Sequence, residues 1–293
     1  MPEPTRVTKA LHDEWPLPKP GSSKHSRGTV LMVGGSTSVP GAMVLAGEAS
    51  LRAGGGRLQV CTTDGVAAQM AVAIPEALVS RAPQLRSGDI SPEAAEQIVE
   101  LAEGASSVLL GPGITSPAAA AALLREVVPA LSHQAVVIDA LGSAYVTEDV
   151  EALHHLDSTP VLTVNPSEIG HTLGIEQDEV EEDPLAATVR LARQARAVVL
   201  CGGPEKLVAN PKGETWKVTE GGPGLGISGS GDVQAGIVAG LLARGATPEQ
   251  AAIWGGWLHG RSGDVLAERI GPLGFLAREL PAVVPELLAD LCR

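Results

Sequence analysis

Short runs of aliphatic residues alternate with longer runs rich in Ala and Leu from about residue 28 to residue 270. The short runs lack a clean alternation of polar and apolar positions, which is typical of parallel strands buried on both faces. These predicted strands are Thr29 to Val33, Arg57 to Thr62, Ser107 to Leu110, Ala135 to Asp139, Pro160 to Thr163 and Ala197 to Cys201.

The longer runs predict helices between the strands. The predicted helices are Ala42 to Ala53, Pro117 to Ala130 and Leu185 to Arg196. This order predicts an α/β fold in which helices cover both faces of a mostly parallel sheet. Lys206 to Val208 and Glu214 to Val218 flank an Asn-Pro-Lys-Gly turn and predict a β-hairpin. After Gly231 we expect mainly helix.

The pattern divides the chain into an N-terminal arm and one domain. Residues 1–27 are polar and Pro-rich, so we expect a loosely structured arm without a secretory signal. Residues 28–293 contain no internal repeat or low-complexity linker, and we expect a single domain there. No apolar run reaches the ~18 residues of a membrane span. We therefore expect a cytoplasmic protein with no membrane partner.

Composition narrows the class of partner. The 293 residues carry a formal net charge of −13, and 2% of them are aromatic. Such a chain repels nucleic-acid backbones and has few rings to stack on bases, so we expect no nucleic-acid partner. A small anion held by backbone amides stays compatible with this charge. Cys61, Cys201 and Cys292 are scattered without metal-ligand spacing, which suits a reducing compartment.

The clearest candidate chemistry lies in a Gly- and Ser-rich segment that leads into a predicted helix. The backbone amides of Gly229, Ser230 and Gly231 at this helix N-terminus predict an anion hole for a phosphoryl group. Asp232, in the first helical turn, is a candidate general base toward a substrate hydroxyl. The alternative interpretation of Asp232 is a helix-capping residue after a flexible loop.

A second candidate is Asn165-Pro166-Ser167-Glu168, which follows the strand predicted to end near Thr163. Asn165 and Glu168 lie three residues apart and can share one face of a helix. An amide and a carboxylate in this position predict a site that organises the waters of a bound Mg²⁺. Ordinary N-capping by Asn165 or Ser167 is the alternative.

Two residues receive structural interpretations. His259 lies on a predicted apolar helix, so we interpret it as a core or interface histidine rather than a catalytic one. Cys201 ends a predicted strand, and no activating base is visible near it in the sequence. We therefore expect a packed thiol at this strand end.

In order and spacing, these segments resemble the ADP-dependent NAD(P)H-hydrate dehydratases, a family of the ribokinase-like superfamily. The resemblance extends over about residues 24 to 285. It implies a three-layer αβα sandwich with a central, mostly parallel sheet. The motifs that carry it are Gly34-Gly35-Ser36, Pro40-Gly41-Ala42, Arg52 to Leu58, Pro75-Glu76, Gly111-Pro112-Gly113, Pro166-Ser167-Glu168, Gly229-Ser230-Gly231-Asp232, His259-Gly260 and Gly263-Asp264.

The family implies a repair reaction in which hydrated NADH or NADPH loses its added hydroxyl. ADP, or alternatively ATP, is the implied co-substrate, Mg²⁺ the implied cofactor and a homo-oligomer, often a tetramer, the implied assembly. By resemblance, Ala42, Gly113, Asn165 and Asp232 contact the hydrated nicotinamide nucleotide. The positions implied to contact the adenine nucleotide are Gly202, Gly203, Pro204, Glu205, Lys206 and Gly231.

Three positions depart from the family pattern. The family usually has His at Asn165 and Lys at Cys201, and its Asp-Ala-Asp-Ala-Leu-Asn run is reduced to Asp139-Ala140-Leu141-Gly142. Lys206 is a candidate replacement for the missing lysine. Two alternatives therefore stay open: a kinase of a vitamin-precursor alcohol, favoured by the Asn-x-x-Glu spacing, and a catalytically degenerate nucleotide sensor. Because the family's fused epimerase domain needs more than 27 residues, we expect the dehydratase part alone.

Overall fold

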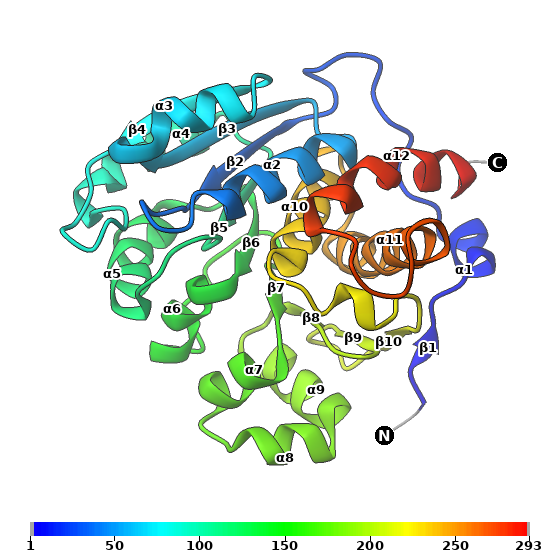
Figure 1. The fold of residues 1–293 in the computed structure, drawn as a ribbon. Coiled ribbons are helices and arrows are strands. Elements are labelled where there is room, and N and C mark those ends of the chain that lie inside the picture. Colours follow the sequence, from blue (N-terminus) through cyan, green and yellow to red (C-terminus); the bar gives the residue numbers. More distant parts are fainter. Residues whose placement is uncertain (1–2, 292–293) are drawn as a thin grey trace.

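The computed structural model describes residues 3–291, which form one ten-stranded sheet between layers of helices (Figure 1). The strand order is β1-β10-β9-β8-β7-β6-β5-β2-β3-β4. Neighbouring strands are parallel except for the two pairs that involve β9. The strands are β1 (Thr5–Arg6), β2 (Thr29–Val33), β3 (Arg57–Thr63), β4 (Ala77–Ala82), β5 (Ser107–Leu110), β6 (Ala135–Asp139), β7 (Val161–Val164), β8 (Val198–Cys201), β9 (Lys206–Ala209) and β10 (Thr215–Val218).

The six predicted strands are confirmed as β2, β3, β5, β6, β7 and β8, and the predicted hairpin is confirmed as β9 and β10. Strand β4 was not predicted. It lies at the edge of the sheet, where Leu78 is exposed and Arg81 interrupts the apolar pattern. The predicted helices are confirmed as α2, α5 and α9, and a short 3₁₀ turn over Val128–Ala130 follows α5.

The sheet separates two hydrophobic cores, because alternate residues of each strand point to opposite faces. Val30 and Met32 of β2 join the core that contains α2, α10, α11 and α12. Leu31 and Val33 join the core that contains α4, α5, α7 and α9. The helices are α1 (Lys9–Glu14), α2 (Gly41–Arg52), α3 (Asp64–Ala73), α4 (Ala95–Glu103), α5 (Pro117–Val127), α6 (Ser143–Glu148), α7 (Pro166–Leu173), α8 (Gln177–Glu182), α9 (Pro184–Gln194), α10 (Ser230–Ala243), α11 (Pro248–Arg269) and α12 (Leu280–Leu291).

The N-terminal segment is more ordered than the loose arm that its composition predicts. Strand β1 pairs in parallel with β10, and Val7 and Leu17 are buried in the core. The Arg244 guanidinium donates to the carbonyl of Pro18 at 2.8 Å. A few apolar anchors are enough to hold a polar segment against the domain. The division into an arm and one domain stays a prediction.

Two glycine turns meet where the strand order reverses, between β2 and β5. The Gly35 amide donates to the carbonyl of Pro112 at 2.7 Å, which joins the two turns. Gly111 has a φ of +119°, and a Cβ there would lie 2.0 Å from the Asp139 carbonyl oxygen. Only glycine fits such an approach, which brings the turn after β5 against the end of β6. No helix within residues 3–291 is long and apolar enough to cross a membrane.

Candidate functional site

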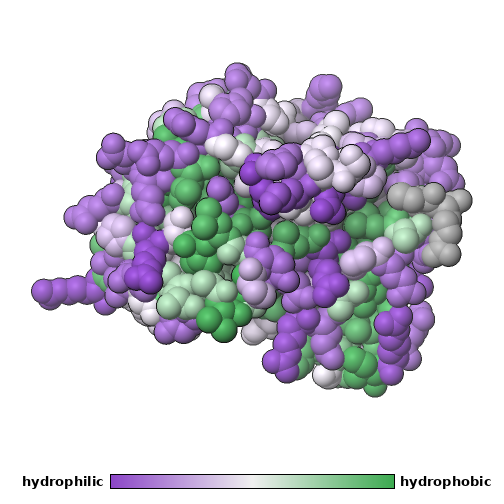
Figure 2. All heavy atoms as spheres, turned by 90° about the horizontal axis from the view of Figure 1, so that it is seen from above, coloured by the Kyte–Doolittle hydropathy of each residue, from purple (hydrophilic) through white to green (hydrophobic). Residues whose placement is uncertain are grey.

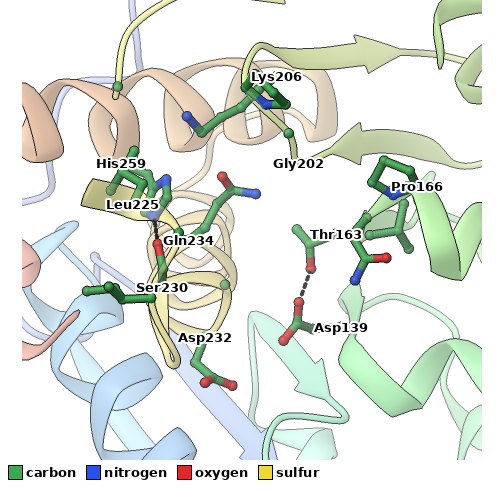
Figure 3. Close-up of a pocket in the computed structure, with 18 of the residues that line it drawn as sticks. Asp139, Thr163, Pro166, Gly202, Lys206, Leu225, Ser230, Asp232, Gln234 and His259 are labelled. Atoms are coloured by element: carbon green, nitrogen blue, oxygen red, sulfur yellow. Dashed lines mark hydrogen bonds between the residues drawn. The ribbon is translucent and has the colours of Figure 1, made fainter. Parts of the chain in front are cut away.

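A cavity of about 990 Å³ lies at the carboxyl ends of β6, β7 and β8, opposite the N-terminus of α10 (Figure 3). Open α/β sheets bind ligands at this edge, and the volume suits a nucleotide. The lining residues are Asp139, Ala140, Thr163, Val164, Asn165, Pro166, Glu168, Gly202, Gly203, Pro204, Lys206, Gly221, Gly222, Pro223, Leu225, Gly226, Ile227, Ser230, Gly231, Asp232, Gln234 and His259.

The N-terminus of α10 presents the predicted anion hole to this cavity. Gly229, the residue before the helix, has a φ of +88°, and a Cβ there would lie 2.4 Å from Leu45 Cδ1. Ser230 and Gly231 line the cavity, whereas Gly229 does not. The Ser230 amide donates to the Ile227 carbonyl at 3.2 Å, and the Asp232 amide bonds to its own carboxylate. The Gly231 amide is therefore the first-turn donor best placed to bind an anion in the cavity.

Asp232 lies in the first turn of α10 and lines the cavity. Burial raises the pKa of Asp232 to about 6, although a hydrogen bond from its own backbone amide opposes the change. The capping alternative is not observed, because the residue at the cap position is Gly229 and no side chain caps the helix. A carboxylate with this pKa is suited to accept a proton near neutral pH.

Asp139 is a second buried carboxyl group in the cavity, and the sequence analysis did not select it as a site residue. Its Oδ1 accepts a hydrogen bond from Thr163 Oγ1 at 2.7 Å. Burial, followed by the charge of Asp232, raises the pKa of Asp139 well above its ordinary value. The next residue, Ala140, has a φ of +48°, a conformation that is strained for a residue other than glycine. Neither the raised pKa of Asp139 nor the backbone conformation of Ala140 has a local sequence signal, because β6 and α10 come together only in the folded chain.

Asn165 and Glu168 form a capping box at the start of α7. Asn165 Oδ1 accepts from the Glu168 amide at 3.0 Å, and Glu168 Oε2 accepts from the Asn165 amide at 2.9 Å. The capping alternative is therefore what the structure contains. Both residues also line the cavity, and burial raises the pKa of Glu168. In the part of the chain that the structure describes, no group of three or more His, Cys, Asp or Glu side chains is arranged to hold a metal.

The loop after β8 forms another wall. Gly202, Gly203 and Pro204 line the cavity, whereas Glu205 turns away and pairs with Lys217 at 2.6 Å. Glu205 therefore lies outside the site formed by its neighbours.

Lys206 is 4% exposed, and its Nζ donates to the Glu220 carbonyl at 3.3 Å. Burial lowers the pKa of Lys206 to about 8, although Asp264 and Glu220 oppose this effect. The amine faces the cavity, in which it is a cation available to a ligand.

Cys201 is the packed thiol that its place at a strand end predicts. It is buried in the core, its Sγ donates to the Gly202 carbonyl at 3.4 Å, and burial raises its pKa to about 11. Cys201 pairs with Leu207 across the β8–β9 ladder, so Lys206 enters the cavity from the strand beside the thiol. A lysine charge is thus present in the site although position 201 lacks it.

Ala42 and Gly113 lie together but outside the cavity lining. Gly113 has a φ of +71°, and a Cβ there would lie 3.1 Å from the Cβ of Ala42. They occupy the region between the two glycine turns, and α2, which carries Ala42, packs against α10. The predicted substrate residues therefore form two groups, Asn165 and Asp232 in the cavity and Ala42 with Gly113 beside it.

The structure adds lining residues that the sequence analysis placed elsewhere or passed over. His259 is buried, as expected of a core histidine, but it also lines the cavity, and its Nε2 lies 2.8 Å from Ser230 Oγ. Gln234, one turn along α10, lines it too. The helical spacing of these residues gives no indication that they face a ligand rather than the core.

The chain has the ribokinase-like fold. A ribokinase-like superfamily protein from Enterococcus faecalis shares this fold with a TM-score of 0.83 and 24% identity, and the match covers 98% of this chain and 96% of that one. An ADP/ATP-dependent NAD(P)H-hydrate dehydratase from Bacillus subtilis, co-crystallised with ATP/Mg²⁺, shares it with a TM-score of 0.86 and 24% identity, and the match covers 99% of both chains. The predicted fold class is confirmed.

The family follows from sequence comparison. The NAD(P)H-hydrate dehydratase family model matches residues 30–286. The chain is 41% identical over 288 residues to the ADP-dependent (S)-NAD(P)H-hydrate dehydratase of Xanthomonas campestris pv. campestris, covering 98% of this chain and 97% of that protein. It matches a bifunctional NAD(P)H-hydrate repair enzyme of Moorella thermoacetica at 34% identity, covering 94% of this chain but 52% of that protein. The chain belongs to the NAD(P)H-hydrate dehydratase family, as the resemblance predicted.

Proposed function

We propose that the protein dehydrates hydrated NADH and NADPH, consumes ADP and releases AMP and phosphate. The observation that carries this proposal is the position of Asp232, with its raised pKa, beside the α10 N-terminus in a nucleotide-sized cavity. The full-length similarity to an ADP-dependent dehydratase supports the substrate class.

In the proposed reaction, Asp232 accepts the proton of the ring hydroxyl as the hydroxyl oxygen attacks the terminal phosphorus of ADP. The new P–O bond forms while the bond to the AMP oxygen breaks. The Gly231 amide at the N-terminus of α10 stabilises the negative charge that develops on the phosphoryl group. The ring nitrogen lone pair then expels phosphate, and a proton lost from the neighbouring ring carbon restores the double bond. This route replaces hydroxide, a poor leaving group, with a phosphate ester.

The two groups of predicted residues suggest how the substrates share the site. The adenine nucleotide would occupy the cavity between Gly202 to Pro204 and Leu225, with Lys206 near its phosphates. The hydrated ring would lie by Asp232 and extend toward Ala42 and Gly113. In this arrangement Asp232 stands between the two substrates, as the phosphoryl transfer requires.

Magnesium fits this site through water. The carboxyl groups of Asp139, Glu168 and Asp232 line one cavity, and a bound cation would favour their charged forms, which burial alone disfavours. Mg²⁺ keeps several of its own waters, so a direct three-ligand site is not required. We propose that Asn165 and Glu168 orient those waters. When bound, the ion would offset phosphate charge.

A cytoplasmic homo-oligomer, tetrameric by family resemblance, is part of the same proposal. Large apolar side chains are exposed on α3 and β4, at Val72 and Leu78, and between α11 and α12, at Ile270, Leu273 and Leu276. Figure 2 shows hydrophobic areas set among polar side chains on one face. Light scattering of the purified chain would measure the assembly directly.

The first experiment incubates the protein with hydrated NADH, Mg²⁺ and either ADP or ATP, and follows the return of reduced-nicotinamide absorbance. We expect recovery that requires a nucleotide, and the better nucleotide identifies the donor. No recovery from folded protein that binds ADP would overturn the dehydratase assignment.

A kinase remains the second candidate, because Asp232 and the α10 amides would equally serve phosphoryl transfer to a stable alcohol. Product analysis separates the two functions. A phosphate ester that accumulates on a vitamin-precursor alcohol such as hydroxyethylthiazole would support the kinase, whereas recovered NADH with free phosphate supports the dehydratase.

A further inference from the structure

His259 and Ser230 form a buried side-chain pair at the cavity, and neither of these side chains has a role in the reaction proposed above. His259, on α11, is 4% exposed, and its Nε2 lies 2.8 Å from the Oγ of Ser230, the first residue of α10. Nδ1 of His259 is buried and has no hydrogen-bond partner within residues 3–291. Figure 3 shows the pair on the same side of the cavity as the amine of Lys206.

The ring is neutral at physiological pH. Burial, followed by the charge of Lys206, lowers the pKa of His259 to about 3, although a hydrogen bond with the Ser230 backbone opposes this. A neutral imidazole carries one N–H and one lone pair, so either Nε2 donates to Ser230 or it accepts from Ser230.

One observation favours the form with the proton on Nε2. If Nδ1 carried the proton, a buried N–H would have no acceptor, and unpaired buried donors are rarer than unpaired acceptors. Nε2 therefore donates, and Ser230 Oγ accepts.

This assignment fixes what Ser230 can offer a ligand. Its Oγ accepts from His259, so its hydroxyl proton is free to point elsewhere, and within the described chain Oγ has no other partner. Ser230 lines the cavity, where helix amides and Lys206 favour an anion. The opposite tautomer would consume the hydroxyl proton and turn an oxygen lone pair toward the anion.

We propose that His259 is a positioning residue that holds the Ser230 hydroxyl as a hydrogen-bond donor to a phosphate oxygen of the nucleotide. This inference rests on the proposed nucleotide-dependent function. It adds a side-chain donor to the anion hole and gives His259 a role that it exerts through Ser230.

The tautomer is the first test, because it needs no ligand. ¹⁵N NMR of the full-length, histidine-labelled protein at pH 7 reports which ring nitrogen carries the proton, and His259→Gln assigns the signal by its loss. We expect a neutral ring protonated on Nε2. A ring protonated on Nδ1 would overturn the proposal.

The second test measures ADP and adenosine binding by calorimetry in Ser230→Ala, His259→Leu and the double variant. A hydrogen bond to a charged group contributes about 1.5–3 kcal/mol, so Ser230→Ala should weaken ADP binding by about 10- to 150-fold. His259→Leu keeps the hydroxyl but not its orientation, so it should lose a measurable part of that affinity. The double variant should lose no more than Ser230→Ala alone, because His259 acts through Ser230. Adenosine, which has no phosphate, should bind equally to all of them.

Two controls complete the design. His259→Gln places an amide N–H near the Nε2 position and should restore most of the ADP affinity that His259→Leu loses. His133→Gln makes the same change at an exposed site outside the cavity and should have no effect.

The outcomes separate the inference from the function on which it rests. Additive losses, equal losses for ADP and adenosine, or unchanged ADP binding in folded His259→Leu each contradict the role of His259. Failure of the parent protein to bind ADP or ATP would instead contradict the proposed function.

Discussion

Burial changes the proton affinity of two residues in the cavity in opposite directions. The pKa of Asp232 is raised to about 6 and that of Lys206 is lowered to about 8. Asp232 can act as a base only when deprotonated, and Lys206 attracts phosphate only when protonated. Between these two values both residues are in the state that the proposed reaction needs.

The first prediction is therefore a bell-shaped dependence of kcat/KM on pH. Activity should rise as pH increases through about 6 and fall as it increases through about 8. Asp264 and Glu220 raise the pKa of Lys206 and so favour its charged form, while His259 stays neutral throughout this pH range. Lys206→Gln should bind ADP more weakly at pH 7 and lose the alkaline decline. Persistence of that decline in Lys206→Gln would assign it to another group.

Asp232→Asn tests the base directly. The amide cannot accept the hydroxyl proton, so we expect turnover to fall by at least about 100-fold, the lower end of general-base contributions. The variant should still fold and bind ADP, because the Asp232 side chain caps no helix. Its melting temperature at pH 7 should equal or exceed that of the parent, since burial raises the pKa of the carboxyl that the variant removes. A variant that keeps a near-normal rate would remove Asp232 from the proposed role.

Asp139 predicts a trade-off between stability and function. Its folded pKa is raised above the unfolded value, so stability is lost as pH rises from the unfolded pKa through the folded one. Asp139→Asn removes the carboxyl group whose ionisation burial opposes, and its amide oxygen can still accept from Thr163. At pH 7 we expect a melting temperature about 2–4 °C higher, a change of about 1 kcal/mol, together with lower activity.

The pH dependence of this gain is its control. Below about pH 4 the parent carboxyl is protonated in both states, so parent and variant should melt together. Equal melting temperatures at pH 7 would contradict the cost assigned to the buried charge of Asp139.

At the scale of elements, two glycines lie at the start of α10 for different reasons, Gly229 just before the helix and Gly231 in its first turn. Gly229 has a left-handed φ of +88° and no room for a Cβ beside Leu45. A Cβ on Gly231 would meet nothing within 4 Å. Backbone conformation and packing therefore require glycine at position 229. At position 231 the protein itself leaves room for a side chain, so we expect a ligand in the cavity to need that space.

Alanine at each position should separate these reasons. Gly229→Ala should lower the melting temperature by several degrees, since a left-handed alanine costs about 1–2 kcal/mol even before the contact with Leu45. Gly231→Ala should melt like the parent but bind ADP more weakly, because its methyl group enters the space proposed for phosphate. Calorimetry and thermal melts read both effects, and unchanged ADP binding in Gly231→Ala would show that the phosphates lie elsewhere.

The elements that the sequence predicted well are those whose residues are buried along the whole element. Strands β2 and β5 are buried along their whole length, so aliphatic runs predict their bounds. Strand β4 lies at an edge, and β1 depends on a partner more than 200 residues away, so neither has a local signal. The Asn-x-x-Glu motif predicted the position of a site residue pair, but the same residues also satisfy a helix N-terminus.

The site itself was only partly predictable for a related reason. The glycine turns and Asp232 could be selected from the sequence, because a tight turn and the start of a helix each require particular residue types. Asp139, Thr163 and His259 belong to three elements that strand order brings together, and their own neighbours in sequence are ordinary core residues. Their role depends on which elements face one another in the folded protein. The sequence patterns around these residues do not specify that arrangement.

At the scale of the whole molecule, the N-terminal segment is part of the folded structure. Leu17 is 9% exposed and packs in the core, whereas Lys19, two residues later, is exposed. Leu17→Ala should destabilise by about 2 kcal/mol or more, and Lys19→Ala should be neutral. Urea unfolding measures both, and equal midpoints would mean that the segment does not contribute to stability.

The pairing of β1 with β10 also has a consequence for synthesis of the protein. Thr5 leaves the ribosome near the beginning of translation, but its partner in the sheet is Trp216. At 5–20 residues per second, roughly 10–40 s pass before that partner exists. During this interval the segment and the apolar side chains it carries have no partner strand, so the hairpin that carries Lys206 gains its outer strand only in a nearly finished chain.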